Sequence, residues 1–550
     1  MLKIALAQTD FHVGHITANQ DRILELIGQA RDEQGADLLV LPELALTGYP
    51  PEDLVLRSGF MRRTEQALAE ITDQVRGIDV LVGYPRAMGG KRYNSVSWLR
   101  DGRILGTYDK WDLPNYAVFD ERRYFVPGTE PLVIEVAGVR VGVLICEDTW
   151  TPEAARAAHK AGAQLLVSAN ASPYYRRKHL DRGEVLKSRH AETGLALIYL
   201  NCIGGQDELV FDGHSLIIDG EGQLSYPGPL CRESLLRVDF HPGTGRFDYR
   251  HWPAGETADL PVIYAVLQCG LRDYVRKNKF STVVFGLSGG IDSALTAALA
   301  ADALGPENVL AVMLPSRHTS ELSLILATEQ IDLLGLNYDN LSIEPIYQAM
   351  TGQLAEAFAG TRENFTEENL QARARGNLIM ALSNKFGHLP LATSNKSELA
   401  TGYSTIYGDM CGGFSPIKDV LKTLVYELAD WRNAQGLAIP QGVIDRPPSA
   451  ELAPNQFDQD KLPPYAVLDE IISRYVEKDQ PISEIVAAGI DEATVRRVAG
   501  MVLTAEYKRR QGAPGPRITR KAFGRDRRYP ITSGWRDSGV LDSDGSGNNA

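Results

Sequence analysis

Two stretches in which short apolar runs alternate with helical segments constrain the fold of this chain more than any other feature. In the first stretch, the runs LKIALAQ, DLLVLPE, VRVGVLICED and AQLLVSANAS have the length of buried strands. In the second stretch, TVVFGLSGG leads directly into the helical segment IDSALTAALAADALG, which ends at Gly305. Strands that are apolar on both faces must be covered by helices, so the sequence predicts an α/β protein with two cores.

A segment rich in Pro, Gly and charge, without periodicity, separates the two stretches at residues 241–262. We predict a first domain at residues 1–245, a linker at 246–262 and a second domain at 263–530. The small polar segment 531–550 is expected to be disordered. The pairs Asp101-Gly102 and Asp219-Gly220 predict hairpins in the first domain, because glycine accepts the positive φ that such turns demand.

Composition excludes several classes of protein. The net charge is −13, from 57 Lys+Arg and 70 Asp+Glu, so the chain is poorly suited to coating nucleic acid. Five cysteines without a C-x-x-C pair argue against a zinc knuckle or a disulfide framework and favour the cytoplasm. No apolar run reaches the roughly 18 residues of a membrane span, and the start MLKIALAQTD lacks the features of a signal peptide.

Three chemically active residues follow predicted strands or a hairpin in the first domain: Glu43 in LPELALTGYP, Lys110 in TYDKWDLPNY and Cys146 in LICEDTW. The segment TPEAARAAHKAG predicts a helix after Cys146, with Thr151 as N-cap and Pro152 at its first position, and a helix N-terminus favours a thiolate. A parallel-type sheet could bring these strand ends to one rim. Each residue alone also fits an ordinary structural role, since a lone Cys after a strand is more often a small core residue.

The ordered set LPEL…TGYPPEDL, YDKWDLPNY…FDERRYF and GVLICEDTW resembles the nitrilase superfamily of carbon–nitrogen hydrolases over most of residues 1–240. The resemblance implies an αββα sandwich of nitrilase type, with a cysteine thioester in the reaction. It implies Glu43 as general base, Lys110 as stabiliser of the oxyanion and Cys146 as nucleophile. The glutamine pocket that it implies is formed by Tyr116, Ser172 and Lys178, with Tyr49 and Glu147 as weaker candidates.

A glycine loop joins a predicted strand to a predicted helix in the second domain, at FGLSGGIDSALTA (285–297). Glycines let the backbone approach a phosphate, and the helix N-terminus offers free N–H groups. The Walker lysine is absent, so the loop is not a P-loop of that type. Asp292 fits a magnesium bridge to phosphate oxygens, and equally a carboxylate that complements the helix dipole.

The string SGGIDS resembles the loop of the ATP-pyrophosphatase superfamily. With EENLQARARGNLIM and LATSNKSELATGYSTIYGD it is similar to NAD synthetases, and NCIGGQDELVFDGHS is similar to the glutamine-dependent form. The resemblance implies a doubly wound parallel sheet, the Rossmann-like fold of adenine nucleotide hydrolases, with Mg²⁺ at Asp292 and Glu398. The implied ATP contacts are Gly286, Leu287, Ser288, Gly289, Gly290, Ile291, Asp292, Ser293 and Thr393. The implied deamido-NAD contacts are Asn369, Glu398, Tyr403, Ser404, Thr405 and Lys508.

Other basic residues are ambiguous. Lys422 matches a position that neutralises phosphates in this family, whereas Arg373 and Arg375 fit the solvated face of a helix equally well. Residues 508–528 carry nine Lys/Arg against Asp526, which fits either a lid over a polyanion or a solvated tail. The segment SRHTSELS (316–323) departs from the family pattern by lacking an Asp, and we expect no substrate contact from it.

The resemblance implies a two-site ligase that amidates deamido-NAD to NAD with glutamine or ammonia as nitrogen donor, and with AMP and pyrophosphate as further products. A passage for ammonia between the sites and a homo-oligomer are further expectations. Two alternatives stay open. One is another acceptor, as in related enzymes that make GMP, asparagine, argininosuccinate or thiolated tRNA. The other is a non-catalytic nucleotide-binding scaffold, which would be expected to have lost Glu43, Lys110, Cys146 or Asp292.

Overall fold

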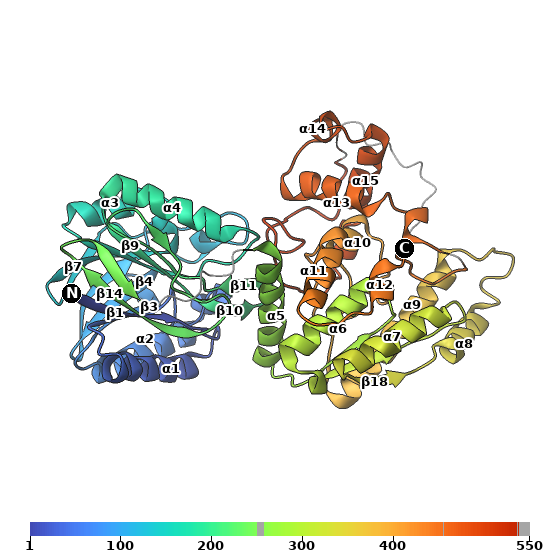
Figure 1. The fold of residues 1–550 in the computed structure, drawn as a ribbon, viewed down its shortest axis with the longest axis horizontal. Helices are drawn as coiled ribbons and strands as arrows, with labels where there is room; N and C mark the ends of the chain where they lie inside the picture. The colour runs from blue at the N-terminus through green and yellow to red at the C-terminus, as the bar shows by residue number, and fades with distance from the viewer. Residues whose placement is uncertain (250–257, 455, 536, 538–550) are drawn as a thin grey trace. The chain divides into compact units, whose positions relative to one another are not determined.

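The computed structural model describes residues 1–249, 258–454, 456–535 and 537. The chain forms two compact units, an N-terminal unit at Met1–Val266 and a C-terminal unit at Leu267–Ala550 (Figure 1). The predicted linker at 246–262 is shorter in the structure, because residues 246–249 pair as a strand and a helix begins at Asp259. Its central part, 250–257, and most of the predicted tail, 536 and 538–550, lie outside the described residues.

Two mixed β-sheets pack face to face in the N-terminal unit. The seven-stranded sheet has the order β15-β14-β1-β2-β3-β4-β5, and the six-stranded sheet has the order β13-β12-β9-β8-β7-β6. The first contains β1 (Leu2–Gln8), β2 (Leu38–Val40), β3 (Asp79–Met88), β4 (Lys91–Arg100), β5 (Arg103–Asp109), β14 (Ser234–His241) and β15 (Arg246–Tyr249). The second contains β6 (Leu132–Val136), β7 (Val139–Ile145), β8 (Leu165–Asn170), β9 (Ala196–Asn201), β12 (Leu216–Ile218) and β13 (Leu224–Ser225). A separate hairpin joins β10 (Ile203–Gln206) to β11 (Leu209–Asp212).

Helices cover the outer face of each sheet, so the layers are αββα as predicted. Helices α1 (Ile16–Gly28) and α2 (Ser58–Gln74) cover one sheet, and α3 (Glu153–Lys160) and α4 (Lys178–Thr193) cover the other (Figure 1). Along β1, Ile4 and Leu6 face the space between the sheets, whereas Ala5 and Ala7 face the helices. This two-residue alternation makes LKIALAQ apolar on both faces.

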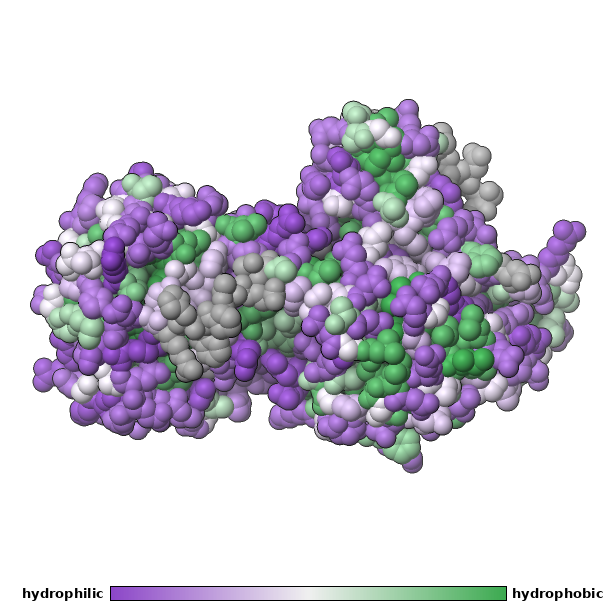
Figure 2. All heavy atoms as spheres, in the orientation of Figure 1, coloured by the Kyte–Doolittle hydropathy of each residue, from purple (hydrophilic) through white to green (hydrophobic). Residues whose placement is uncertain are grey.

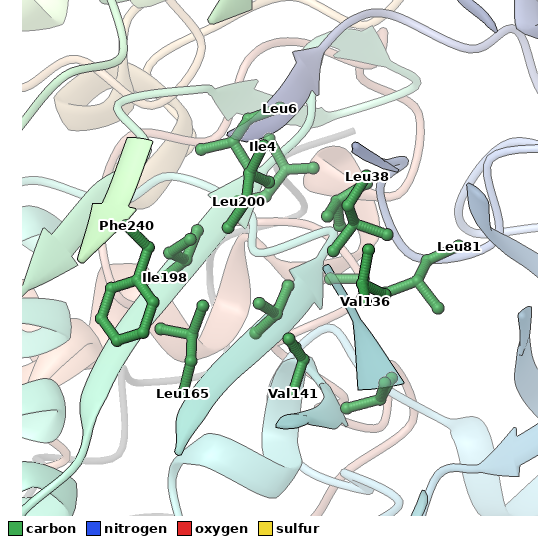
Figure 3. Close-up of a cluster of buried hydrophobic side chains, with 14 of the residues drawn as sticks. Ile4, Leu6, Leu38, Leu81, Val136, Val141, Leu165, Ile198, Leu200 and Phe240 are labelled. Carbon is green, nitrogen blue, oxygen red and sulfur yellow. The ribbon is translucent and has the colours of Figure 1, made fainter. Parts of the chain in front are cut away.

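The core between the two sheets is aliphatic. Figure 3 shows residues of both sheets that face one another across it, among them Ile4, Leu38, Val141 and Ile198. Fully burying one such side chain contributes about 1.5–3 kcal/mol. Both Asp-Gly hairpins predicted from the sequence are present, since β4 pairs with β5 and β12 pairs with β13 in antiparallel register.

A four-stranded parallel sheet organises the C-terminal unit, in the order β18-β17-β16-β19. Its strands are β16 (Val283–Gly286), β17 (Val309–Met313), β18 (Asn337–Asn340) and β19 (Leu389–Pro390). The helices α5 (Asp259–Lys277), α6 (Ile291–Leu304) and α7 (Glu321–Leu334) pack on one face. On the other face α9 (Phe365–Phe386) contributes Ala374 and Ile379 to a second core. Helices on both faces confirm the predicted doubly wound fold.

The order of strands places a switch point beside β16. From β16 the chain proceeds to β17 and then β18 on one side, and later returns to β19 on the other. In open α/β sheets a ligand binds at the carboxyl ends of the strands where the order reverses. Here the loop after β16 is the predicted phosphate loop.

Shorter helices complete the C-terminal unit, and four of them, at Lys396–Thr401, Tyr465–Ile472, Ile482–Ala487 and Glu492–Thr504, form a core of their own with Phe523. Among the described residues, no helix combines the length and apolar character needed to cross a membrane. The remaining helices are α8 (Glu344–Leu354), α10 (Lys396–Thr401), α11 (Lys422–Ala434), α12 (Gln441–Asp445), α13 (Tyr465–Ile472), α14 (Ile482–Ala487), α15 (Glu492–Thr504) and α16 (Glu506–Arg509).

Candidate active sites

A buried lysine holds together the first candidate site. The Nζ of Lys110, just after β5, donates to Glu43 Oε1 at 2.7 Å and to Glu121 Oε1 and Oε2 at 2.9 and 3.0 Å. Burial would lower the pKa of Lys110, but the charges of Glu121 and Glu43 raise it well above its ordinary value. The ammonium is therefore fully charged and fixed between two carboxylates.

Glu43 is oriented by three donors. Besides Lys110, Asn94 Nδ2 donates to its Oε1 at 2.7 Å, and the backbone N–H of Ala171 donates to Oε2 at 3.0 Å. Glu43 as a whole residue is 2% exposed. A carboxylate with this many donors has one orientation, which suits a general base.

Cys146 lies at the turn after β7, in a left-handed backbone conformation with φ 46°. Asp148 holds this turn closed, since its Oδ2 accepts from the backbone N–H of Ile145 and from the hydroxyl of Tyr108. Burial and the charge of Glu43 raise the pKa of the Cys146 thiol well above its ordinary value, and the Lys110 charge opposes them. The expected thiolate is therefore wrong for the free protein, because burial and the charge of Glu43 favour the thiol and the helix predicted after Cys146 begins only at Glu153.

Two further expectations about this site need correction. Glu43 and Lys110 follow strands of the seven-stranded sheet and Cys146 follows a strand of the six-stranded sheet, so two facing sheets supply the groups rather than one rim. Thr151 does not cap α3, since its hydroxyl donates to Asp112 and the helix begins at Glu153 with Pro152 as N-cap.

Glu121 is a member of this site that the sequence reasoning missed. It is 5% exposed and accepts from Lys110 and, at 2.9 Å, from the hydroxyl of Tyr49. Burial raises the pKa of Glu121 to about 7, although the charge of Lys110 lowers it. The motif FDERRYF contains Glu121 next to Asp120, and nothing in the sequence indicates which of these two acids belongs to the site.

The residues expected to bind glutamine lie around Cys146 and differ in exposure. Tyr116 is 54% exposed, and its hydroxyl donates to Glu147 Oε1 at 2.9 Å. Lys178 Nζ lies 3.8 Å from the ring centre of Trp150, and burial lowers the pKa of this lysine to about 7. Trp150 ends the turn that begins at Cys146, so Lys178 and Tyr116 both contact this turn.

Ser172 is held by a buried ion pair. Arg182 is fully buried and donates to both oxygens of Asp212 at 2.9 Å, and also to the backbone carbonyl of Ser172 at 2.8 Å. Its guanidinium also reaches the Ser172 hydroxyl at 3.3 Å. The sequence reasoning did not foresee this support, which comes from residues far apart in the chain.

The second candidate site is a cavity of about 280 Å³ at the carboxyl ends of β16, β17 and β19. The loop after β16 is closed by its own serines: the N–H of Ser288 donates to Ser293 Oγ, and the N–H of Gly290 donates to Ser288 Oγ. Gly289 has φ +78°, and a Cβ there would meet the carbonyl oxygen of Ser323 at 2.4 Å, so the position requires glycine.

Most of the residues expected to contact ATP line this cavity. They are Gly286, Leu287, Ser288, Gly290, Ile291, Asp292, Ser293 and Thr393, whereas Gly289 is outside the lining. Of those expected to contact deamido-NAD, Glu398 and Tyr403 line it as well. The others lie outside the lining but contact one another or neighbouring loops: Asn369 accepts from the Thr405 hydroxyl, and Lys508 donates to the carbonyls of Gly402 and Ser404.

Asp292 and Glu398 share one cation, the ammonium of Lys422. It donates to Asp292 Oδ2 and, at 3.3 Å, to Glu398 Oε1. Burial and the charge of Asp292 raise the pKa of Glu398, so this pair of carboxylates is costly without positive charge nearby. Two carboxylates beside a phosphate loop supply the oxygen ligands that Mg²⁺ prefers.

Two predictions about the surroundings of this cavity change. Thr319 and Ser323 line it, so the segment SRHTSELS, from which no contact was expected, is part of its wall. The basic stretch after Tyr507 is not a solvated tail throughout. Several of its charges pair internally, as Arg517 does with Asp526 and Arg527 with Glu506.

Comparisons with known proteins agree over nearly the whole chain. Residues 3–244 match the family model described as carbon-nitrogen hydrolase, and residues 263–512 match that described as NAD synthase. The glutamine-dependent NAD(+) synthetase of Xanthomonas campestris pv. campestris (strain 8004) is 53% identical over 97% of this chain and 98% of its own length. That of Acinetobacter baylyi is 47% identical over 97% of this chain and 99% of its own length.

Two solved structures share the arrangement of elements. The glutamine-dependent NAD+ synthetase from Acinetobacter baumannii, in complex with ADP, superposes with a TM-score of 0.79 at 42% identity over 98% of this chain and 99% of that chain. The enzyme of the same description from Cytophaga hutchinsonii gives a TM-score of 0.81 over 97% of this chain and 98% of that chain. Its 22% identity supports the fold alone.

Proposed function

The chain belongs to the glutamine-dependent NAD(+) synthetases, glutamine-hydrolysing carbon–nitrogen ligases, and on this premise we propose the roles of its residues in the reaction. Glutamine is hydrolysed in the N-terminal unit, and ATP and deamido-NAD react in the cavity of the C-terminal unit. The observation that carries the proposal is the presence, in one chain, of the Lys110-centred site beside Cys146 and of the serine-closed loop after β16.

In the glutaminase reaction, Glu43 removes the proton of the Cys146 thiol as the sulfur attacks the amide carbon of glutamine. This order follows from the raised pKa of the thiol, which leaves it protonated until substrate arrives. The ammonium of Lys110 faces the charge that develops on the amide oxygen. Glu43 passes the thiol proton to the departing nitrogen, so that ammonia leaves and a thioester remains on Cys146, and Glu43 then activates the water that hydrolyses it.

We assign recognition of the two charged ends of glutamine to a pair of residues. Glu147, next to the nucleophile and bonded to Tyr116, suits the α-ammonium group. Lys178, buried against the Trp150 ring, suits the α-carboxylate. Ser172, which Arg182 holds in place, is proposed as a third contact for glutamine. Burial makes such a charge pair selective, because an analogue that lacks one charge would leave its partner desolvated and unpaired.

In the synthetase reaction, the loop Ser288–Ser293 and the N-terminus of α6 hold the phosphates of ATP. The carboxylate of deamido-NAD attacks the α-phosphorus, pyrophosphate leaves, and ammonia displaces AMP from the adenylate to give NAD. The binding of ADP by the Acinetobacter baumannii relative supports the nucleotide site. Asp292 and Glu398 would hold Mg²⁺, which when bound neutralises charge on the phosphate oxygens.

Ammonia links the two reactions. Free ammonia would be protonated at neutral pH and diluted by solvent, and ammonium is no nucleophile. We therefore propose that ammonia passes to the adenylate without equilibrating with the solvent. A competition experiment tests this: unlabelled glutamine and ¹⁵N-ammonium are offered together, and channelling predicts NAD that is poorer in ¹⁵N than the free ammonium pool.

The variant Cys146→Ala tests the division of labour. It should abolish NAD formation from glutamine and leave NAD formation from ammonium unchanged, with pyrophosphate and NAD both measured. Loss of both activities would contradict the proposal. Xanthosine monophosphate, supplied in place of deamido-NAD, tests the acceptor and should give no pyrophosphate.

Self-association and a cytoplasmic location complete the proposal. None of the five cysteines, all of which lie in the described part of the chain, forms a disulfide, which fits a reducing compartment. Helix α7 exposes Leu322, Ile325 and Leu333 by 51%, 54% and 38%, and Figure 2 shows apolar surface over this helix. Such a surface favours contact with another copy. Light scattering in solution, which gives the mass of the assembly, should show more than one 60.4 kDa chain.

A further inference from the structure

Arg375 is a largely buried arginine whose charge the protein leaves mostly unused. It lies on α9 and lines the cavity at the carboxyl end of the parallel sheet. Its Nε donates to the carbonyl oxygen of Leu314 at 3.0 Å, just beyond β17. Among the residues that the structure describes, its two terminal amino groups make no hydrogen bond.

The acidic residues around Arg375 have other partners. Glu451 accepts from Ser320, Ser323 and Arg446. Asp409 accepts from the backbone N–H of Thr405 at 2.6 Å. Both carboxylates act on Arg375 through space, yet burial dominates and lowers the pKa of its guanidinium to about 10. Arg375 therefore remains charged at neutral pH while its desolvation is incompletely offset.

Position and packing keep this guanidinium at the cavity. Gly376, the next residue, lies against the loop that follows α10, and a Cβ there would meet the carbonyl oxygen of Tyr407 at 2.7 Å. The bond to Leu314 fixes the other side. The remaining donors form a planar fork, which matches the geometry of phosphate oxygens.

The other cation in the cavity is already engaged. Lys422 is shared by Asp292 and Glu398. A nucleotide that enters brings several negative charges into a cavity that also contains Asp458, Glu451 and Asp409. We propose that Arg375 is a substrate-binding residue that donates through its terminal amino groups to a phosphate oxygen of the nucleotide. This inference rests on the proposed function of the cavity and adds a contact that the sequence left equivocal.

The test changes Arg375 in two ways on the full-length protein. Arg375→Gln deletes the fork, and Arg375→Lys keeps a charge without the fork. Lys385→Gln is the matched control, because it removes one charge from the exposed end of the same helix. Binding of ATP is measured by calorimetry without deamido-NAD. KM for ATP and for deamido-NAD is measured with ammonium as nitrogen donor, and thermal unfolding reports whether each variant folds.

Arg375→Gln should weaken binding to the nucleotide by about 10- to 100-fold, Arg375→Lys by less, and Lys385→Gln by under about twofold. A loss confined to ATP assigns the contact to its triphosphate, and a loss confined to KM for deamido-NAD assigns it to that pyrophosphate. Unchanged constants for both nucleotides in a folded Arg375→Gln or Arg375→Lys variant would overturn the inference. A wild-type protein that binds ATP but makes no NAD would instead contradict the proposed function.

Discussion

The two candidate sites treat charge in opposite ways. In the N-terminal unit, the central ammonium is already held by the protein before substrate binds, since Lys110 contacts three carboxylate oxygens of Glu43 and Glu121. In the C-terminal unit, Arg375 uses one donor and Lys422 stands between two carboxylates that suit a metal ion. The first site is complete before substrate arrives, whereas the second is completed by what it binds.

The difference follows from the substrates that we propose. The amide of glutamine is neutral, so the groups that attack it must already be aligned and charged. ATP is a polyanion, and a cavity that satisfied all its own cations internally would have none to offer. Substitutions in the first site should therefore act on kcat, and substitutions in the second on binding of nucleotide and metal.

Glu43→Gln is the strongest test of a preassembled site. Without a base, the Cys146 thiol keeps its proton, because burial holds its pKa well above the ordinary value. Glutamate release should fall by about 10³- to 10⁴-fold, at the upper range for general-base catalysis. NAD synthesis from ammonium should continue. Glu135→Gln, at an exposed position of β6, is the control, and an equal loss in both variants would refute the assignment of Glu43.

Asp292→Asn tests the cavity of the C-terminal unit, which we propose is completed by the nucleotide and metal that it binds. Removing this charge should weaken the binding of Mg²⁺, so pyrophosphate release at a fixed Mg²⁺ concentration and saturating ammonium should fall by about 100-fold, a loss typical of a group that stabilises charge near the reacting centre. Part of the activity should return as the Mg²⁺ concentration rises. Asp302→Asn lies on the same helix at an exposed position and should have little effect. Unchanged turnover in Asp292→Asn would remove its proposed role.

Glu121→Gln tests how far glutamine hydrolysis depends on Glu121, the second carboxylate that contacts Lys110. The variant leaves Lys110 paired with Glu43, so we expect kcat for glutamine hydrolysis to fall by roughly tenfold, the cost of one charged hydrogen bond. KM should change little, because Glu121 contacts Lys110 and Tyr49 rather than the residues proposed to bind glutamine. Tyr49→Phe removes only a neutral donor to Glu121 and should cost less. A larger effect on KM than on kcat would argue against this division.

The sequence predicted best where function depends on local backbone geometry. The strand-to-helix turn at SGGIDS and the end of α6 at Gly305 were both foreseen, because glycine and strand length specify them over a few residues. Partners distant in the chain were not foreseen. Glu121 and the Arg182–Asp212 pair gain their roles only when separate segments pack together.

Competition between interactions explains the wrong expectations. Thr151 was a reasonable N-cap by sequence, but its hydroxyl bonds to Asp112, 39 residues away. The thiol of Cys146 was expected to ionise beside a helix, but burial and Glu43 favour its protonated form. In both cases a tertiary contact outweighs a local preference, and no pattern in one sequence reports such a contact.

The smallest expected effect concerns the pH dependence of glutamine hydrolysis. It tests the ammonium of Lys178, a charge in the N-terminal site that we propose pairs with the substrate. Burial lowers the pKa of Lys178 to about 7, with Arg182 contributing, while Cys146, Asp181 and Glu147 oppose the shift. Above this pH the free protein loses the cation proposed to bind the α-carboxylate. Wild-type kcat/KM for glutamine should therefore fall by up to tenfold per pH unit above about 7.

Lys178→Arg keeps the charge at every pH, so its kcat/KM should fall less steeply between pH 7 and 9 than that of the wild type. Stability should respond in the opposite sense. The unfolded chain holds the Lys178 proton up to a pKa of about 10.5 and the folded chain only to about 7, so the unfolding free energy due to this group rises with pH across that window. Identical pH profiles for the two proteins would show that the Lys178 charge takes no part in binding glutamine.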